Sequence, residues 1–80
     1  MRIDKFLKVS RLVKRRTVAK ELADQGRIKV NGRVVKSSYD VKVGDSIEVG
    51  YGTRQVKAKV LDIRETTKKA EASELYEIVD

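Results

Sequence analysis

The sequence predicts a small α+β domain: two N-terminal helices packed on a small antiparallel sheet, with a short helix near the C-terminus. Apolar residues recur at helical spacing in the first 25 positions and alternate with polar residues between positions 28 and 63. They return to helical spacing after position 66. Because 80 residues make one small domain, all three segments are expected to share one core. We expect a core motif at 1–49 and an extension at 50–80 within this single domain.

The first helix is indicated by an apolar stripe at positions i, i+3, i+4, i+7 and i+10. The stripe consists of Ile3, Phe6, Leu7, Ser10 and Val13. Asp4 is placed to cap the first turn of this helix or to stabilise it by its charge.

The second helix is indicated by a shorter apolar stripe, which consists of Val18, Ala19, Leu22 and Ala23. Gly26 is expected to end it, because glycine readily takes the left-handed conformation of a helix C-cap. The polar residues 14–17 between the stripes form either the connection or the first turn of the second helix.

The sheet is indicated by a change of period after Gly26. Asn31-Gly32 predicts a type I′ hairpin turn between a strand at 28–30 and a short strand at 34–35. A second turn is expected at 41–45, followed by a strand through Ile47 and Val49. Residues 54–63 then alternate, with Val56, Ala58 and Val60 expected to face inward.

The tail from Thr66 to Asp80 predicts a final helix, because Ala72, Leu75, Tyr76 and Val79 share one helical face. Thr66 or Thr67 is placed to cap it. Tyr76 is expected to pack, whereas Tyr39 and Tyr51 could pack or stack on bases.

The net positive charge is confined to one part of the chain. Residues 1–36 hold twelve Lys and Arg against three Asp and Glu, whereas residues 37–80 hold seven against nine. Two packed helices could place most of the first set on one outer face, which favours binding to nucleic-acid phosphates over a solvated surface of mixed sign. The cations on or between the helices are Arg2, Lys5, Lys8, Arg11, Lys14, Arg15, Arg16, Lys20 and Arg27.

The composition argues against catalysis. The chain has no Cys and no His, and no pair of carboxylates stands in an apolar context that would shift a pKa. It also lacks a glycine-rich loop that would cradle a phosphate. We therefore expect no catalytic residue, no metal site and no cofactor. The polar N-terminus and the absence of a long apolar run favour a cytoplasmic protein without a membrane partner.

Two other classes stay open at this point. A nucleoid DNA-binding protein is one, since residues 4–25 alone could form a helix-turn-helix, although Glu21 and Asp24 are poorly suited to reading base edges. A protein-interaction module whose basic face meets an acidic partner is the other.

The first 49 residues resemble the S-four-type RNA-binding domain, also called the αL motif. The resemblance lies in Arg2-Ile3-Asp4-Lys5-Phe6-Leu7, Arg16, Ala19, Gly26-Arg27-Ile28, Val30-Asn31-Gly32 and Val41-Lys42-Val43-Gly44-Asp45. Among stand-alone forms the chain resembles the RqcP family, through residues 5–12, 14–17 and 23–27 and, in the tail, Thr66-Thr67-Lys68-Lys69 and Tyr76. The related heat-shock ribosome-recycling protein shares the frame but carries a basic extension.

This resemblance implies a function and a set of contacts. It implies binding, as a monomer off the ribosome, to large ribosomal subunits stalled with peptidyl-tRNA, through large-subunit rRNA and tRNA. It also implies support of alanine tailing by an RqcH-like factor, with heat-shock-type subunit recycling as the alternative. Arg2 and Arg16 would be the principal RNA contacts, with Lys5, Arg11, Lys14, Arg15 and Thr17 around them.

Overall fold

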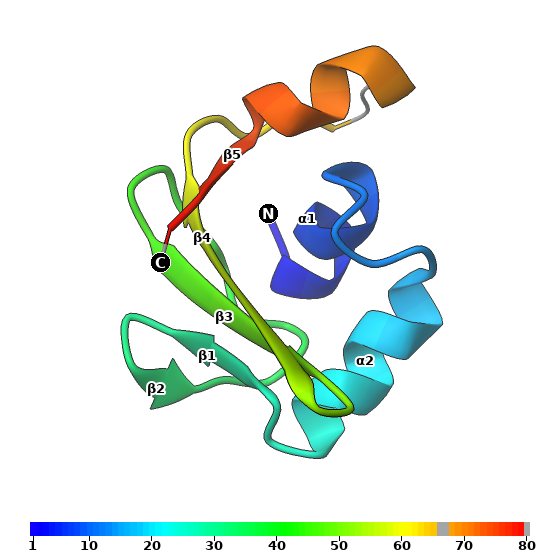
Figure 1. Ribbon diagram of the computed structural model, residues 1–80, viewed down its shortest axis with the longest axis vertical. Coiled ribbons are helices and arrows are strands. Elements are labelled where there is room, and N and C mark those ends of the chain that lie inside the picture. The colour runs from blue at the N-terminus through cyan, green and yellow to red at the C-terminus, as the bar shows by residue number, and fades with distance from the viewer. Residues whose placement is uncertain (66–67, 80) are drawn as a thin grey trace.

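The computed structural model describes residues 1–65 and 68–79. Two helices are followed by four strands, a 3₁₀ helix and a fifth strand (Figure 1). In chain order the elements are α1 (Ile3–Val9), α2 (Arg16–Asp24), β1 (Ile28–Val30), β2 (Arg33–Val34), β3 (Ser46–Tyr51), β4 (Arg54–Val60), η1 (Lys69–Glu74) and β5 (Tyr76–Ile78).

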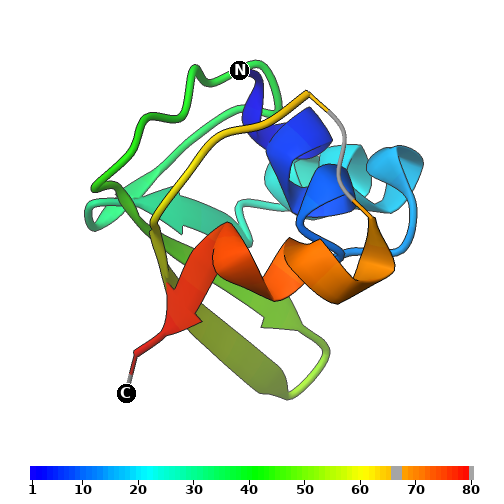
Figure 2. The same cartoon turned by 90° about the horizontal axis from the view of Figure 1, so that it is seen from above.

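All five strands form one antiparallel sheet in the order β2-β1-β3-β4-β5. The helices α1 and α2 pack together on one face of it, and η1 with β5 closes one end (Figures 1 and 2). The alternation expected in β4 is confirmed, because Ala58 and Val60 are buried and Val56 is half-buried. The opposite face carries exposed polar side chains, which include Lys29, Gln55, Lys57 and Lys59.

The core lies between the helices and the sheet. Ile3, Phe6 and Leu7 of α1 are fully buried, and they share one cluster with Ile28 of β1 and Ile47 of β3. Since the three α1 residues sit at i, i+3 and i+4, burial of one helical face is enough to form this helix of only seven residues. The predicted stripe continues beyond the helix, however. Ser10 and Val13 are buried from the turn that follows Val9.

The hairpin prediction is confirmed by the backbone. Asn31 has a φ of 52° and Gly32 a φ of 86°, as a type I′ turn requires of both central residues. The strand after it is β2, Arg33–Val34, which begins one residue earlier than expected. The turn at 41–45 is also present, and its Gly44 has a φ of 94°.

The tail forms only part of the predicted helix. A short helix is confirmed as the 3₁₀ segment η1, but residues 76–78 form β5 instead of continuing it. Pairing of β5 with β4 satisfies backbone groups at the sheet edge, and this outweighs the helical spacing of the side chains. Leu75 is fully buried, Tyr76 packs against the core, and Val79 is exposed. The caps expected at Thr66 or Thr67 lie outside the described residues.

Among the described residues, no helix has the length and apolar character needed to span a membrane.

Candidate nucleic-acid interface

A buried carboxylate lies beside two of the predicted RNA-contacting cations. Asp4, in the first turn of α1, is 0% exposed, yet its side chain contacts two arginines. Arg2 donates from Nε to Asp4 Oδ1 at 3.3 Å and from Nη2 to Oδ2 at 3.2 Å. Arg16 Nε lies 3.3 Å from Asp4 Oδ1. A buried charge is costly unless it is paired, so Asp4 holds both guanidinium groups beside it.

The two arginines face solvent on their other sides. The side chain of Arg2 is 47% exposed and that of Arg16 is 45% exposed, although both contact a carboxylate that is fully buried. Each guanidinium therefore keeps donors free for a ligand. Because a planar guanidinium can engage two phosphate oxygens or stack on a base, two such groups fixed side by side suit an RNA backbone.

The chain before α1 is held against a distant segment, and this positions Arg2. The Met1 ammonium lies 2.6 Å from Asp40 Oδ1. Backbone bonds from Ile3 N to Tyr39 O and from Val41 N to Met1 O are each 2.8 Å long, and Arg2 forms an isolated bridge with Asp40. The hydrogen bond from the Met1 ammonium keeps the pKa of Asp40 below its usual value. Residue 2 is thus held within the folded structure and is not part of a free N-terminal segment.

The start of α2 positions Arg16. Arg15 is the N-cap residue and makes no side-chain capping bond, so the helix begins without the hydroxyl that Ser or Thr would supply there. Arg16 and Thr17 follow in the first turn, which resolves the ambiguity over residues 14–17: Lys14 belongs to the connection. The predicted contact residues in the connection and in α2 are all exposed: Lys14, Arg15, Arg16, Thr17 and Lys20.

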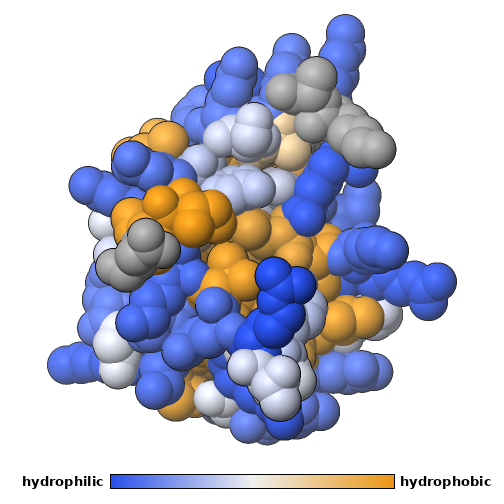
Figure 3. All heavy atoms as spheres, in the orientation of Figure 1, coloured by the Kyte–Doolittle hydropathy of each residue, from blue (hydrophilic) through white to orange (hydrophobic). Residues whose placement is uncertain are grey.

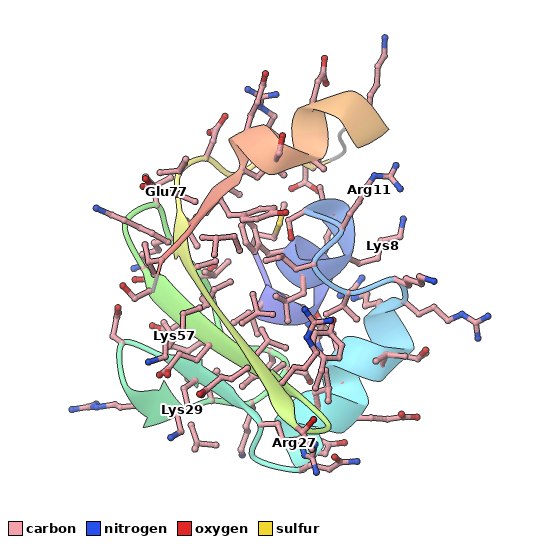
Figure 4. All side chains as sticks on the ribbon, viewed as in Figure 1. Lys8, Arg11, Arg27, Lys29, Lys57 and Glu77 are labelled. Carbon is pink, nitrogen blue, oxygen red and sulfur yellow. The ribbon has the colours of Figure 1, made fainter. Side chains whose placement is uncertain are left out.

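The cations of α1 differ in their surroundings. Lys5 is half-buried and forms an ion pair with Glu65, whose pKa is lowered by that contact. Lys8 and Arg11 are exposed, and Figure 4 shows both pointing outward from the α1 side of the molecule. In Figure 3 most of the right-hand margin, where Figure 1 places the helices, is hydrophilic. Lys8 and Arg11 are therefore open to solvent, whereas Lys5 is partly neutralised.

Arg27 does not lie with this group. It follows α2 in the loop that leads to β1, and in Figure 4 it lies at the opposite end of the molecule from Lys8 and Arg11. Of the ten predicted contact residues, which are the nine cations and Thr17, Arg27 therefore does not share the outer face expected for the helices.

Sequence reasoning missed the acidic partners of these cations. The N-cap residue of α1 is Arg2, but Asp4 is the acidic residue of the first turn, as predicted, and its Oδ1 accepts a hydrogen bond from the Lys5 N–H at 2.7 Å. The same carboxylate also pairs with two arginines, which the sequence did not predict. The spacing of Asp4 on the buried face, beside Ile3 and Leu7, is a signal that could have revealed a buried carboxylate. Nothing local could have revealed Asp40 or Glu65.

The tyrosines left open are packed. Tyr39 packs against the core, and the Tyr51 hydroxyl donates to the Leu12 carbonyl at 2.5 Å. Burial raises the pKa of Tyr51. In the described part of the chain, no group of three or more His, Cys, Asp or Glu side chains is placed to hold a metal ion.

Comparison with known proteins identifies the domain and the family of this chain. Residues 1–47 match the model of the S4 domain. The chain is 57% identical over 79 residues to proteins of Streptococcus pneumoniae and Bacillus subtilis that are named RQC P-site tRNA stabilizing factor. Each alignment includes 99% of this chain, and the two alignments include 90% and 92% of the respective relatives.

Two solved structures share the fold. Heat Shock Protein 15 of Vibrio cholerae superposes with a TM-score of 0.91 at 28% identity, over 99% of this chain and 81% of that one. The hypothetical protein HP1423 superposes with a TM-score of 0.85 at 32% identity, over 100% and 98% of the two chains. The S4 match and the full-length identity together show that this chain belongs to the RQC P-site tRNA stabilizing factor family of S4-domain proteins, as its resemblance to RqcP predicted.

Proposed function

We propose that this protein is a non-enzymatic RNA-binding factor of ribosome-associated quality control. In this proposal it binds large ribosomal subunits that retain peptidyl-tRNA after a stall, and it supports alanine tailing of the nascent chain by an RqcH-like factor. It acts in the cytoplasm and is a monomer when it is off the ribosome.

One observation carries the RNA-binding part of this proposal. Arg2 and Arg16 come from different elements, yet both are ordered against Asp4, a carboxylate that is itself fully buried. A merely solvated basic surface needs no such arrangement, because exposed charges gain little from fixed geometry. The names of the relatives that are 57% identical support the ribosomal setting.

The first test changes the guanidinium groups without removing charge. Arg2→Lys and Arg16→Lys are compared with the parent in co-sedimentation with large subunits that carry peptidyl-tRNA. Lysine lacks the planar fork, so we expect each variant to bind at least about tenfold more weakly, a loss of ~1.4 kcal/mol. Lys59→Ala, on the exposed face of β4, serves as the control and should bind like the parent.

Arg16→Ala completes the series. Because Arg16 pairs with Asp4, some loss of thermal stability is expected beside the loss of binding, but Arg2 still contacts the carboxylate and the fold should persist. Parent-like binding by both lysine variants and by Arg16→Ala would contradict the role given to these residues.

A second candidate function is subunit recycling without tailing. The TM-score of 0.91 to Heat Shock Protein 15 favours it, since the two folds superpose over almost the whole of this chain. Deleting the gene and measuring alanine tails on a stalled reporter separates the two functions. Loss of tails supports the quality-control role, and unchanged tails with accumulated peptidyl-tRNA on free large subunits support recycling.

A further inference from the structure

A second cationic surface lies beyond the far end of α2. It is an open depression of about 290 Å³ between the loop that precedes β1 and the turn that joins β3 to β4. Figure 4 shows Arg27 and Lys29 here, well away from Lys8 and Arg11. Its lining residues are Gly26, Arg27, Lys29, Gly50, Gly52, Thr53, Arg54 and Gln55.

The three cations of this depression are not paired with carboxylates in the described part of the chain. Arg27, Lys29 and Arg54 take part in none of the ion pairs between described residues, and no carboxylate lines the depression. The nearest acid in the sheet register is Glu48, which stands opposite Lys29 but contacts Lys57 at 3.7 Å and accepts a hydrogen bond from Gln55. Three cations around one open space attract an anion.

Gly50 keeps the floor of the depression open. It lies inside β3 with Arg27 on one side, to whose carbonyl its N–H donates at 2.9 Å, and with Gln55 as its partner on the other. The three atoms nearest to a Cβ at this position would belong to Arg27, at 3.5 Å or more, and the φ of Gly50 lies outside the left-handed region. The backbone therefore does not require glycine here. A glycine inside a strand weakens it and often marks a bulge, a bend, or the close approach of a ligand or of another backbone segment. Gly50 pairs regularly with Gln55, so no bulge explains it.

The chemistry of the lining selects the ligand class. Arginine forks, a lysine ammonium, a threonine hydroxyl and a glutamine amide all donate hydrogen bonds to phosphate oxygens. No apolar side chain lines the depression. A protein partner would lack the buried anchor that protein interfaces depend on.

We propose that this depression binds the phosphate backbone of a second RNA segment, separate from the one held by Arg2 and Arg16. The inference rests on the proposed RNA-binding function and adds to it a bridging geometry. Arg16 begins α2 and Arg27 follows its end, and nine helical residues span about 13 Å, so the two sites can hold two RNA segments at once.

The test fills the depression without changing its charge. Gly50→Thr places a β-branched side chain on the floor and suits a strand, so its thermal melt should equal or exceed that of the parent. The double variant Arg27→Gln with Arg54→Gln removes two cations and keeps similar side-chain volume. Lys59→Gln, on the same face outside the depression, is the matched control.

Binding is measured with two probes for the parent and each variant, by filter retention for bulk deacylated tRNA and by co-sedimentation for purified large subunits. We expect both depression variants to lose about tenfold or more for one probe and to keep parent-like binding to the other, with no change for Lys59→Gln. Parent-like binding of both probes by both variants would overturn the inference. The inference would also be overturned if the variants bound both RNA probes normally but lost binding to a polyglutamate peptide, because the depression would then be a site for an acidic protein.

The outcome is separable from that of the proposed function. If the Arg2 and Arg16 variants bind normally while the depression variants fail, the first site is wrong and the second stands. If the parent retains neither RNA, both fail together.

Discussion

At the scale of single residues, both α-helices are followed by a residue in the left-handed conformation, but only one of the two is glycine. Gly26 ends α2 with a φ of 72°, and the N–H groups of Gly26 and Arg27 donate to the carbonyls of Ala23 and Leu22. Arg11 occupies the equivalent place after α1 with a φ of 63°, and its N–H donates to Lys8 O. A left-handed conformation suits glycine and is strained for arginine. The strain persists at a residue that is presented to solvent on the basic surface, which favours a role in binding.

Arg11→Gly should therefore stabilise the fold and weaken binding. Relief of the left-handed conformation is worth about 1–2 kcal/mol, and the greater chain entropy of glycine offsets about 0.5–1 kcal/mol of that. The melting temperature should rise by a few degrees in thermal unfolding. Binding to large subunits should fall because one cation is lost.

Arg11→Lys is the control for this prediction, since it keeps both the charge and the strained conformation and should melt like the parent. If Arg11→Gly bound subunits as tightly as Arg11→Lys, Arg11 would be a strained residue without a binding role.

The sequence indicates which residues belong to the candidate site, but it does not indicate which side chains they contact in the folded chain. The basic residues cluster in the first 36 positions, so the cations were visible in the sequence. Their partners were not, because Lys5 pairs with Glu65 and the Met1 ammonium with Asp40, contacts that only the folded chain creates. Arg27 follows the second helix directly in the sequence, which predicts that it lies with the helices. The Schellman turn at Gly26 redirects the chain and places it elsewhere.

At the scale of elements, patterns enforced by local backbone chemistry were predictable. Asn31-Gly32 specified a hairpin because both residues accept a positive φ, and the alternation in β4 specified which face is buried. The tail was harder, because four residues at helical spacing can also pack from a 3₁₀ turn followed by a strand. Hydrogen bonding of Val79 N to Lys57 O and the pairing of β5 with β4 decided the outcome. Such long-range pairing leaves no trace in local spacing.

The segment that precedes α1 behaves as a short strand, and its ionic contact gives a pH dependence. The pKa of Asp40 is lowered in the folded protein, chiefly by the hydrogen bond from the Met1 ammonium. A lowered carboxyl pKa stabilises the fold above the unfolded value of 3.8 and loses that contribution as the pH falls through the folded value. The parent should therefore melt at a slightly higher temperature than Asp40→Asn at pH 6, and this difference should shrink below about pH 4.

Thermal melts of both proteins at low salt, between pH 6 and pH 3, measure this difference. Asp40 is well exposed, so the effect is small and is reduced further by added salt. A gap of constant size across this range would show that Asp40 acts through something other than its charge. Because the same contact adjoins Arg2, Asp40→Asn should also weaken subunit binding modestly.

At the scale of the whole molecule, the segment that contains both α-helices is strongly basic, whereas the remainder of the chain is nearly neutral. The acidic residues of 37–80 nearly balance their cations, whereas residues 1–36 carry twelve cations against three acids. Two of these cations, Arg2 and Arg16, are partly compensated by Asp4. Others lie on or between the helices without an ion pair among the described residues, and Arg27 and Lys29 line the depression on the sheet. The molecule thus presents cations at both ends of α2.

This distribution makes the binding of ribosomal subunits strongly dependent on salt. Each cation that contacts a phosphate releases a counterion, whereas an apolar interface releases almost none. If about five cations make such contacts, a fourfold rise in salt should weaken binding on the order of a hundredfold. Sedimentation with large subunits across a series of potassium chloride concentrations gives the slope directly. The double variant at Arg27 and Arg54 should lower that slope by about one to two if both residues contact phosphates, whereas Lys59→Gln should leave it unchanged. A flat salt response of the parent would mean that this basic surface is not what holds the protein on its RNA.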